Sequence, residues 1–218
     1  MWRQLLDLLL PPACAACGRS GALLCPACLG AFGPPSRLED RFLAPDAGIV
    51  VGDALLVGKA VFAHAGPLRR ALAALKYTGA ARLAPVLARA AAPALSRLLE
   101  VSGRATLVPV PVHRERQRLR GYNQAALLGR ELALASGQPL ADVLVRTRPT
   151  TKQHRLDRAA RLANLRGAFG VREGALVPAR VIVVDDIITT TATLEACASV
   201  LVGSGVAEVY GFAVAREV

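Results

Sequence analysis

Two adjacent carboxylates, Asp185 and Asp186, follow four β-branched residues and precede a run of small hydroxyl residues. The apolar run Val181–Val184 predicts a strand that is buried on both faces and ends at the carboxylates. A helical pattern follows the hydroxyl run, from Leu194 to Leu201. The free N–H groups of a helix N-terminus bind anions, whereas paired carboxylates suit sugar hydroxyls or a hydrated cation. The segment therefore predicts a site for a ligand that carries phosphate, ribose and Mg²⁺.

This segment resembles the phosphoribosyl diphosphate (PRPP) motif of type I phosphoribosyltransferases. The resemblance implies that Asp185 and Asp186 hold the ribose hydroxyls and that the following loop holds the 5′-phosphate, through Thr189, Thr190, Thr191, Ala192 and Thr193. Thr191 stands where that family usually has glycine. A β-branched residue neither adopts positive φ easily nor permits close backbone approach, so we expect a strained or reshaped loop. The alternative is an ordinary buried strand and capped helix, although unpartnered adjacent carboxylates are costly.

The net charge of +11 is concentrated in one part of the chain. Residues 110–172 hold 13 Lys and Arg against 4 Asp and Glu, a net of +9. Such a concentration indicates either a nucleic-acid surface or a pocket for a polyanion such as PRPP. The apolar run Leu5–Leu10 is too short for a membrane span or a signal peptide. We therefore expect a short N-terminal helix in a cytoplasmic protein that does not insert into membranes.

Four arginines occupy alternate positions after a predicted strand at 105–112: Arg114, Arg116, Arg118 and Arg120. The alternation predicts an extended loop that lines an anion groove, because guanidinium forks match pyrophosphate oxygens. A solvated charged loop is the alternative. Tyr122 is placed to stack on a base or to close the pocket, and Asn123 to cap a helix from Gln124 to Leu134.

A second basic segment spans residues 146–158 and follows a predicted strand at 142–145. In the transferases, the loop at this position is a mobile lid that excludes water from the reacting centre. The resemblance thus assigns lid roles to Lys152, Gln153 and Arg158. His154 is either a general base or, as is commoner for a loop histidine, merely exposed.

Four cysteines form two C-x-x-C pairs seven residues apart, namely Cys14 with Cys17 and Cys25 with Cys28. Together the pairs present four thiolates to one ion, which predicts a structural Zn²⁺ with no position open for catalysis. Disulfides are the main alternative, but nothing marks the chain as secreted. A ribbon this short depends on zinc for much of its folding energy. We expect Cys197 to be a small core residue.

The order of predicted elements indicates an α/β fold with a mainly parallel sheet flanked by helices. We expect a short helix and zinc ribbon in residues 1–33, a linker in 34–48 and a phosphoribosyltransferase-like domain in 49–218. That domain begins with a hairpin at 49–62 and two helices, from Pro67 to Gly79 and from Ala80 to Leu99, the second bent at Pro93. Further strands are predicted at 105–112, 142–145, 168–171, 181–184 and 208–215. Ligands of such sheets bind beyond the carboxyl ends of the strands.

Over nearly its full length, the chain resembles the ComF family of GntX-like, amidophosphoribosyltransferase-like proteins. The motifs that carry the resemblance are the two cysteine pairs, Leu75-Lys-Tyr-Thr-Gly79, Val108-Pro-Val-Pro-Val112, Arg120-Gly-Tyr-Asn-Gln124, Thr151-x-Gln153, Arg161-x-x-Asn164-x-x-Gly167-Ala-Phe169 and Asp185-Asp186. The family implies a zinc ribbon joined to a phosphoribosyltransferase domain. In some bacteria it also implies a role in taking up DNA during natural transformation.

Together these features lead us to expect an enzyme that binds Mg²⁺–PRPP and transfers ribose 5-phosphate to an unknown acceptor, releasing pyrophosphate. The expected catalytic residues are Asp185, Asp186, Lys152 and Arg158. The four alternate arginines would stabilise the leaving pyrophosphate. Candidates for the acceptor pocket are Lys76, Tyr77, Tyr122, Asn123 and Gln153. The alternatives are a protein that handles single-stranded DNA and a PRPP-sensing regulator without turnover.

Overall fold

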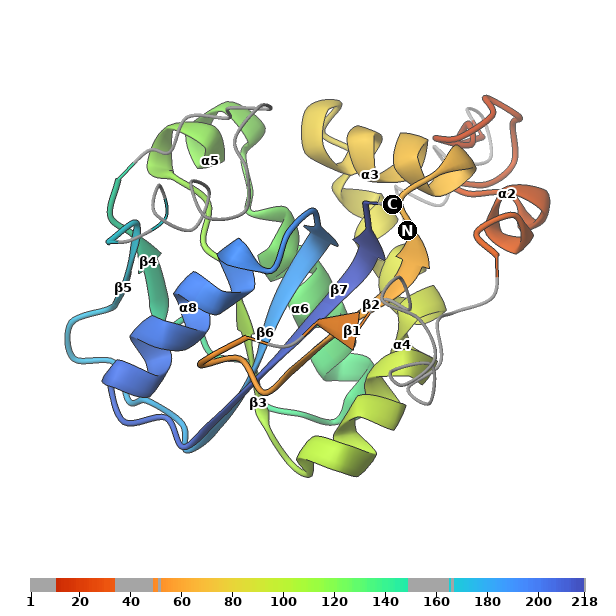
Figure 1. Cartoon of the computed structure of the whole chain (residues 1–218). Coiled ribbons are helices and arrows are strands. Elements are labelled where there is room, and N and C mark those ends of the chain that lie inside the picture. Colours follow the sequence, from red (N-terminus) through yellow and green to blue (C-terminus); the bar gives the residue numbers. More distant parts are fainter. Residues whose placement is uncertain (1–10, 34–48, 51, 149–164, 166, 218) are drawn as a thin grey trace.

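The computed structural model describes residues 11–33, 49–50, 52–148, 165 and 167–217. Its main sheet has five strands in the order β1-β2-β7-β6-β3 (Figure 1). These strands are β1 (Ile49–Val50), β2 (Val57–Ala63), β3 (Thr106–Pro109), β6 (Arg180–Ile188) and β7 (Glu208–Arg216). Among the five, β1 pairs with β2 in an antiparallel hairpin and every other pairing is parallel. The predicted α/β class and the predicted hairpin are both confirmed.

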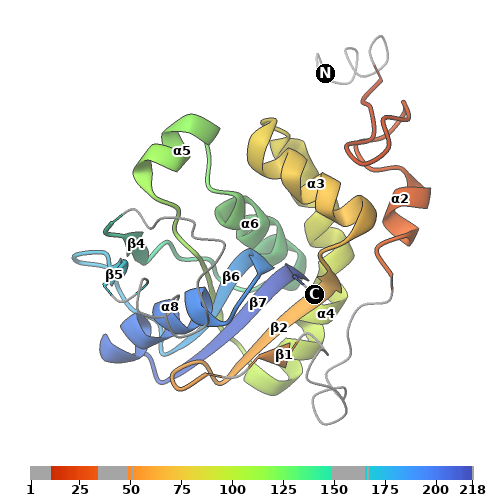
Figure 2. The same ribbon diagram turned by 45° about the horizontal axis from the view of Figure 1, so that its top comes forward.

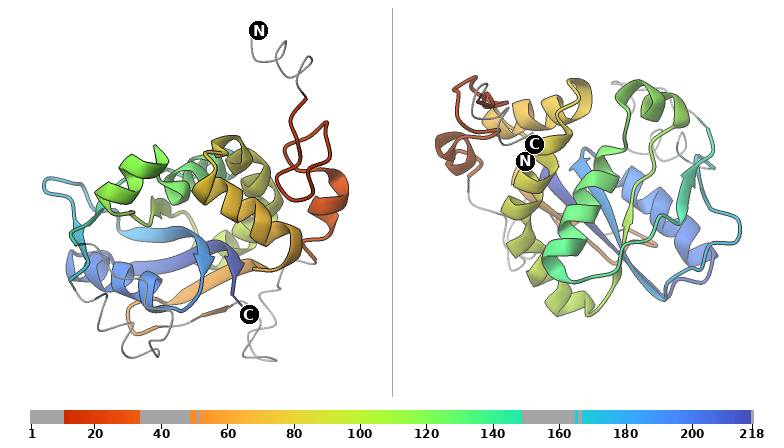
Figure 3. Two further views of the ribbon diagram at one scale, coloured as in Figure 1. Left: turned by 90° about the horizontal axis from the view of Figure 1, so that it is seen from above. Right: turned by 180° about the vertical axis from the view of Figure 1, so that it is seen from behind.

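Helices cover both faces of this sheet (Figures 1 and 3). One face carries α3 (Gly66–Tyr77), α4 (Ala84–Ser102) and α6 (Gln124–Ser136), and the other carries α8 (Ala192–Gly203). The side chains of β6 alternate between the two cores: Ile182 and Val184 belong to the core under α4 and α6, and Val181 and Val183 to the core under α8. A central parallel strand is buried on both faces in this way, which explains its unbroken apolar sequence.

Strand β6 is longer than its apolar run predicts. It continues beyond Val184 because β7 is equally long and pairs with it as far as Ile188, opposite Arg216. On the other side, β3 ends at Pro109, opposite Val184. The prediction that the strand ends at the carboxylates is therefore wrong: Asp185 and Asp186 lie on a strand segment that has a neighbour on one side alone.

The strands predicted at 142–145 and 168–171 form a separate two-stranded antiparallel sheet. They are β4 (Leu144–Arg146) and β5 (Phe169–Val171), and α8 packs beside them. The expectation that they extend the parallel sheet is wrong. The edge of β3 is already occupied by the segment around Leu140, since the Leu107 N–H donates to Pro139 O and the Ala141 N–H to Leu107 O.

The two helices predicted after the hairpin are present. Pro67 lies in the first turn of α3, where its missing N–H costs no hydrogen bond. A short 3₁₀ turn, η2 (Ala81–Leu83), leads into α4, which contains Pro93. Of the described helices, none is both long and apolar enough to cross a membrane.

The cysteine-containing segment packs against the main domain beside α3 (Figure 2). It contains one short helix, α2 (Pro26–Gly30). Phe32 meets Phe62 of β2 edge to face, with ring centroids 5.5 Å apart, so both units share one hydrophobic core. The predicted N-terminal helix and the predicted linker at 34–48 lie outside the described residues.

Candidate functional site

Asp186 is the centre of a polar cluster at the carboxyl end of β6. Its side chain is 3% exposed, and its Oδ2 lies 2.5 Å from the Nζ of Lys76, in the last turn of α3. Gln124, at the start of α6, donates from Nε2 to Asp186 Oδ1 at 3.4 Å. Arg120 donates in turn to Gln124 Oε1 at 2.8 Å. The end of α3 and the start of α6, two distant parts of the chain, thus converge on one carboxylate of β6.

Asp185 has different surroundings, although it is the next residue. Its Oδ1 accepts a hydrogen bond from the Asp186 N–H at 2.8 Å. Burial, followed by the neighbouring Asp186 carboxylate, raises the pKa of Asp185 well above its ordinary value, while Lys76 opposes the rise. The charge of Asp185 also helps burial to raise the pKa of Cys197 in α8. The two carboxylates are therefore not equivalent: Asp186 has a cationic partner, and Asp185 carries an electrostatic penalty when ionised.

The hydroxyl-rich loop connects β6 to the N-terminus of α8, as predicted. Thr189 is exposed, Thr190, Thr191 and Thr193 are partly exposed, and Ala192 is buried at the first position of the helix. Thr191 has right-handed helical angles, φ −61° and ψ −18°, so the expected backbone strain is not found. The loop leaves N–H groups and hydroxyls at a helix start, which suits an anion.

The first turn of α8 also contains a buried carboxylate, Glu195. Its two oxygens accept hydrogen bonds from the N–H groups of Ala54 (2.8 Å) and Leu55 (3.1 Å), which lie between β1 and β2. Gly52 makes room for this contact, because a Cβ atom there would lie 1.7 Å from Glu195 Oε2. Glu195 therefore fixes the start of α8 to the loop that precedes β2.

The alternating arginines form a helix, α5 (Arg114–Arg120), and the prediction of an extended loop is wrong. Arginine, glutamine, glutamate and leucine all favour helix, and Gly121, with φ +80°, ends it. In a helix, alternate positions do not share a face. Arg116 and Arg120 are accordingly partly buried against the protein, whereas Arg114 and Arg118 are exposed.

The predicted pocket residues near α3 have distinct placements. Tyr77 is 64% exposed, and the Arg120 guanidinium lies 5.3 Å from the centroid of its ring. Tyr122 is partly buried and donates its hydroxyl hydrogen to Leu75 O at 2.6 Å, which fixes the end of α3. Asn123 caps α6 as predicted, since its side chain accepts from the Ala125 N–H and donates to Val110 O.

The predicted lid residues Lys152, Gln153 and Arg158, and also His154, lie outside the described residues. One residue at the base of this segment was missed by the sequence analysis. Arg146, at the end of β4, lies over the ring of Phe169 at 5.2 Å, and burial and the charge of Arg116 lower its pKa, while Asp185 raises it. Its position as the first basic residue after a strand is the signal that could have identified it.

The four cysteines of the two C-x-x-C pairs form one cluster. Their sulfur atoms all lie within 4.8 Å of one another and form no disulfide. Four thiolates at about 2.3 Å from a tetrahedral zinc would lie roughly 3.8 Å apart, close to the 3.7 Å between the sulfurs of Cys17 and Cys25. Gly18, with φ +77°, closes the first turn by donating to Cys14 O. These residues could hold a zinc ion.

The acidity of Cys14 also suits a metal site. Burial raises the pKa of its thiol, but hydrogen bonds from the backbone N–H groups of Cys25, Ala16 and Cys17 outweigh this effect and lower it to about 6. Metals bind the thiolate form. The lowered pKa of Cys14 favours the form that a metal binds.

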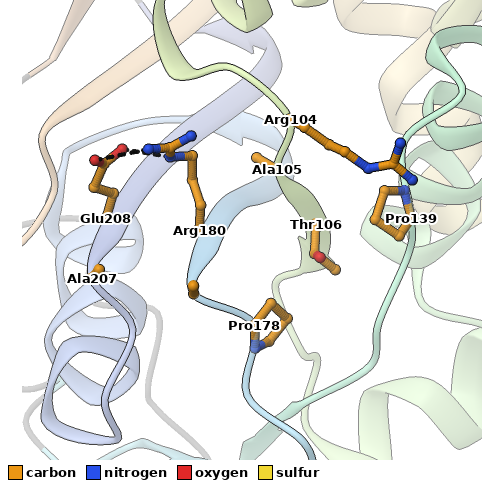
Figure 4. Close-up of a pocket in the computed structure, with 9 residues that line it drawn as sticks. Arg104, Ala105, Thr106, Pro139, Pro178, Arg180, Ala207 and Glu208 are labelled. Carbon is orange, nitrogen blue, oxygen red and sulfur yellow. Dashed lines mark hydrogen bonds and ion pairs between the residues drawn. The ribbon is translucent and has the colours of Figure 1, made fainter.

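A surface pocket of about 410 Å³ lies at the opposite edge of the sheet (Figure 4). It is lined at the amino ends of β3, β6 and β7, and Arg180 forms two hydrogen bonds with Glu208 at its wall. Arg104 and Thr106 line the same pocket. Ligands of parallel sheets bind at the carboxyl ends of the strands, whereas this pocket lies at the amino ends. The charges of Arg180 and Glu208 also neutralise each other. This pocket is therefore not the candidate site.

Comparison with known proteins finds relatives along much of the chain. A DNA utilization protein YhgH of Salmonella typhi is 30% identical over 214 residues, which cover 93% of this chain and 88% of that protein. Competence protein F of Haemophilus influenzae is 37% identical over 113 residues, covering 50% of this chain and 49% of that protein. Competence protein ComFC of Bacillus subtilis is 28% identical over 170 residues, which cover 77% of this chain and 68% of that protein. No protein-family model matches the chain.

Proposed function

We propose that this chain, which belongs to the ComF family of competence and DNA utilization proteins, binds Mg²⁺–PRPP. We further propose that it does so in a pathway of DNA uptake. The observation that carries the proposal is the cluster around Asp186. Lys76 and Gln124 contact this carboxylate at the carboxyl end of a parallel strand, directly before a loop and helix start that suit a phosphate.

In this proposal each part of the site contacts one part of the ligand. Asp185 and Asp186 accept hydrogen bonds from the ribose hydroxyls, and the loop from Thr189 to Thr193 binds the 5′-phosphate. Arg116 and Arg120, which face the protein, bind the pyrophosphate. If transfer to an acceptor occurs, these arginines stabilise the leaving pyrophosphate while the carboxylates face the developing positive charge of the sugar. The acceptor would approach from the side of Lys76 and Tyr77.

Calorimetric titration with PRPP in the presence of Mg²⁺ tests the proposal. The intact protein should bind, and the double variant Asp185→Asn, Asp186→Asn should lose most of its affinity. Asp142→Asn is the matched control, since its exposed carboxylate pairs with Arg172 away from the site. Absence of binding by the folded, metal-loaded protein would refute the proposal. If binding is found, release of pyrophosphate in the presence of candidate acceptors separates a transferase from a PRPP-sensing regulator.

We also propose that the cysteine cluster holds a structural zinc ion. The four sulfur atoms have the spacing of a tetrahedral site, and all four ligand positions are filled by protein. Elemental analysis of protein purified without chelator should find one zinc per chain, and Cys17→Ser should lower that content.

A second candidate function, binding of single-stranded DNA, is favoured by the exposed Tyr77 rather than by Tyr122, whose hydroxyl donates to Leu75 O. Tyr77 is exposed and lies beside Arg120 and the basic helix α5, the combination of aromatic and cationic groups that binds single strands. Binding of an oligothymidine should weaken steeply with salt. Tyr77→Ala should reduce its affinity roughly tenfold, whereas Leu134→Ala, at an exposed position of α6, should not.

A further inference from the structure

Helix α3 lies beside the cysteine-containing segment (Figure 2), and its last turn contacts the candidate ribose site through Lys76. Its first turns pack beside the ribbon, and its last turn reaches Asp186. The helix spans 12 residues, or about 18 Å at 1.5 Å per residue. Helix α3 therefore connects the two sites directly and is an element through which one could influence the other.

At the ribbon, the described residues of α3 make apolar contacts and a hydrogen bond from Arg70. Arg70 Nε donates to Ala16 O at 2.5 Å. Ala16 is buried and lies between Cys14 and Cys17, inside the first metal-binding turn. A guanidinium that donates to a carbonyl forms a charge-assisted bond, stronger than a neutral one. The carbonyl is held in place only while the turn keeps its shape, which depends on the metal in a ribbon of this size.

At the other end, the last turn of α3 is fixed by two contacts. Lys76 forms the ion pair with Asp186, and Leu75 O accepts the hydroxyl hydrogen of Tyr122, the residue before the cap of α6. Arg70 and Lys76 are six residues apart, about 9 Å along the axis of one helix. A rotation or shift of α3 at Arg70 therefore displaces Lys76 relative to Asp186.

The structure assigns Arg70 as a positioning residue that couples the zinc ribbon to the candidate ribose site through α3. With zinc bound, the Ala16 carbonyl holds Arg70, and α3 places Lys76 on Asp186. Without zinc, the turn loses its shape, Arg70 loses its acceptor, and Lys76 no longer orients the carboxylate. This inference rests on the proposed function for its ligand, but the coupling itself is measurable without that ligand. The metal thereby acts on ligand affinity from outside the site.

The neighbouring Arg69 supplies a matched control. It is an exposed arginine of the same helix turn, and its side chain makes no hydrogen bond or ion pair with the residues that the structure describes. Arg69→Ala and Arg70→Ala remove the same charge and leave the same helix-favouring residue. Arg70→Lys keeps a cationic donor and should restore part of the contact with Ala16 O.

The decisive experiment measures the affinity for Mg²⁺–PRPP with zinc bound and after its removal, in the intact protein and in each variant. We expect zinc to raise the PRPP affinity of the intact protein roughly tenfold. Because coupling is reciprocal, PRPP should raise the zinc affinity by the same factor, measured by equilibrium competition with a chelator. Arg70→Ala should bind zinc but lose both effects, Arg70→Lys should regain part of them, and Arg69→Ala should behave as the intact protein.

Hydrogen exchange separates a failure of this inference from a failure of the proposed function. Zinc removal should speed exchange of the backbone amides in the last turn of α3 and around Tyr122, and Arg70→Ala should do the same with zinc still bound. If the intact protein binds no PRPP, the proposed function fails and exchange alone decides the coupling. Unchanged exchange in α3, or coupling that persists in Arg70→Ala, would overturn the inference.

Discussion

Asp186 and Lys76 form an ion pair that is nearly withdrawn from water, with side-chain exposures of 3% and 19%. Removing one partner of such a pair leaves a charge that is poorly solvated, whereas removing both leaves none. We therefore expect Lys76→Met to lower the free energy of unfolding by about 2 kcal/mol, after allowance for the partial exposure of Lys76. Asp186→Asn should lower the free energy of unfolding by less, because the Lys76 side chain that is left without a partner can extend into water.

A double-mutant cycle measured by urea denaturation tests this expectation. The double variant Lys76→Met, Asp186→Asn should be more stable than the sum of the two single losses implies, with a coupling of about 1–2 kcal/mol. Simple additivity of the two losses would contradict the ion pair.

Asp185 should make stability depend on pH in the opposite sense to an ordinary carboxylate. Its pKa is raised in the folded protein, first by burial and then by Asp186. The folded state therefore binds this proton more tightly than the unfolded state, and stability falls as pH rises from the unfolded pKa through the folded one. Asp185→Asn should be more stable than the intact protein at neutral pH, and the difference should vanish near pH 3. Thermal unfolding of both proteins from pH 3 to neutral pH measures this difference in stability. An equal difference at pH 3 and at neutral pH would refute the raised pKa of Asp185.

Residue types indicated some of this site in advance, but not its contacts. Two adjacent carboxylates before a hydroxyl-rich loop identified Asp185 and Asp186. Lys76 was selected as a pocket residue, and its pairing with Asp186 was not foreseen, because no local pattern connects positions so distant in the chain. Gln124 was expected only to begin a helix, yet it donates to the same carboxylate.

At the scale of elements, α8 is positioned by its contact with the loop between β1 and β2. Gly52→Ala would push the Glu195 carboxylate away from the Ala54 and Leu55 N–H groups that it satisfies. We expect a loss of about 1–3 kcal/mol in the free energy of unfolding, since buried N–H groups would lack acceptors. PRPP affinity should also fall, because α8 begins with the loop assigned to the phosphate.

Gly203→Ala is the control for this prediction. Gly203 ends the same helix, and a Cβ atom there would meet no atom within 4 Å. Its replacement should leave stability unchanged or slightly higher. Chemical denaturation measures the free energy of unfolding of both variants. Equal losses of stability in Gly52→Ala and Gly203→Ala would show that the contact with Glu195 does not cause the loss in Gly52→Ala.

Helix α5 was predicted as an extended loop, and its residue types explain why that prediction was wrong. Alternation of arginines suggested an extended loop, but all residues between Arg114 and Arg120 favour helix, and a glycine follows. Local propensity and the stop signal were more informative than the spacing of charges. The strands β4 and β5 were found, but their pairing was not, because a three-residue strand carries no periodicity that specifies its neighbour.

At the scale of the whole molecule, the five cysteines divide into two chemical classes. Four form the cluster that would bind zinc, of which Cys17 alone is exposed, and Cys197 is fully buried in α8, where burial raises its pKa. A thiol reagent should therefore react slowly with the zinc-loaded protein. After chelation four thiols should react, and the fifth only after denaturation. Rapid reaction of five thiols in the chelated protein would show that the main domain does not hold its fold without the metal.

The class of the fold was predictable, because apolar runs and intervening helical patterns specify a mainly parallel α/β sheet. The attachment of the ribbon was not. Sequence analysis separated residues 1–33 from the domain, whereas Phe32 packs on Phe62 and the cysteine segment shares the main core. A shared core depends on matching surfaces of distant segments, which composition and spacing do not encode.

This shared core affects the order of events during synthesis. The cysteines leave the ribosome early, but the apolar side of the ribbon has no partner until β2 and α3 have been made. Elongation at about 5–20 residues per second separates Cys28 from the end of α3 by roughly 3–10 s. During that interval a nascent ribbon exposes Phe32 to solvent and to chaperones, and early capture of a metal ion would be its main protection against misfolding.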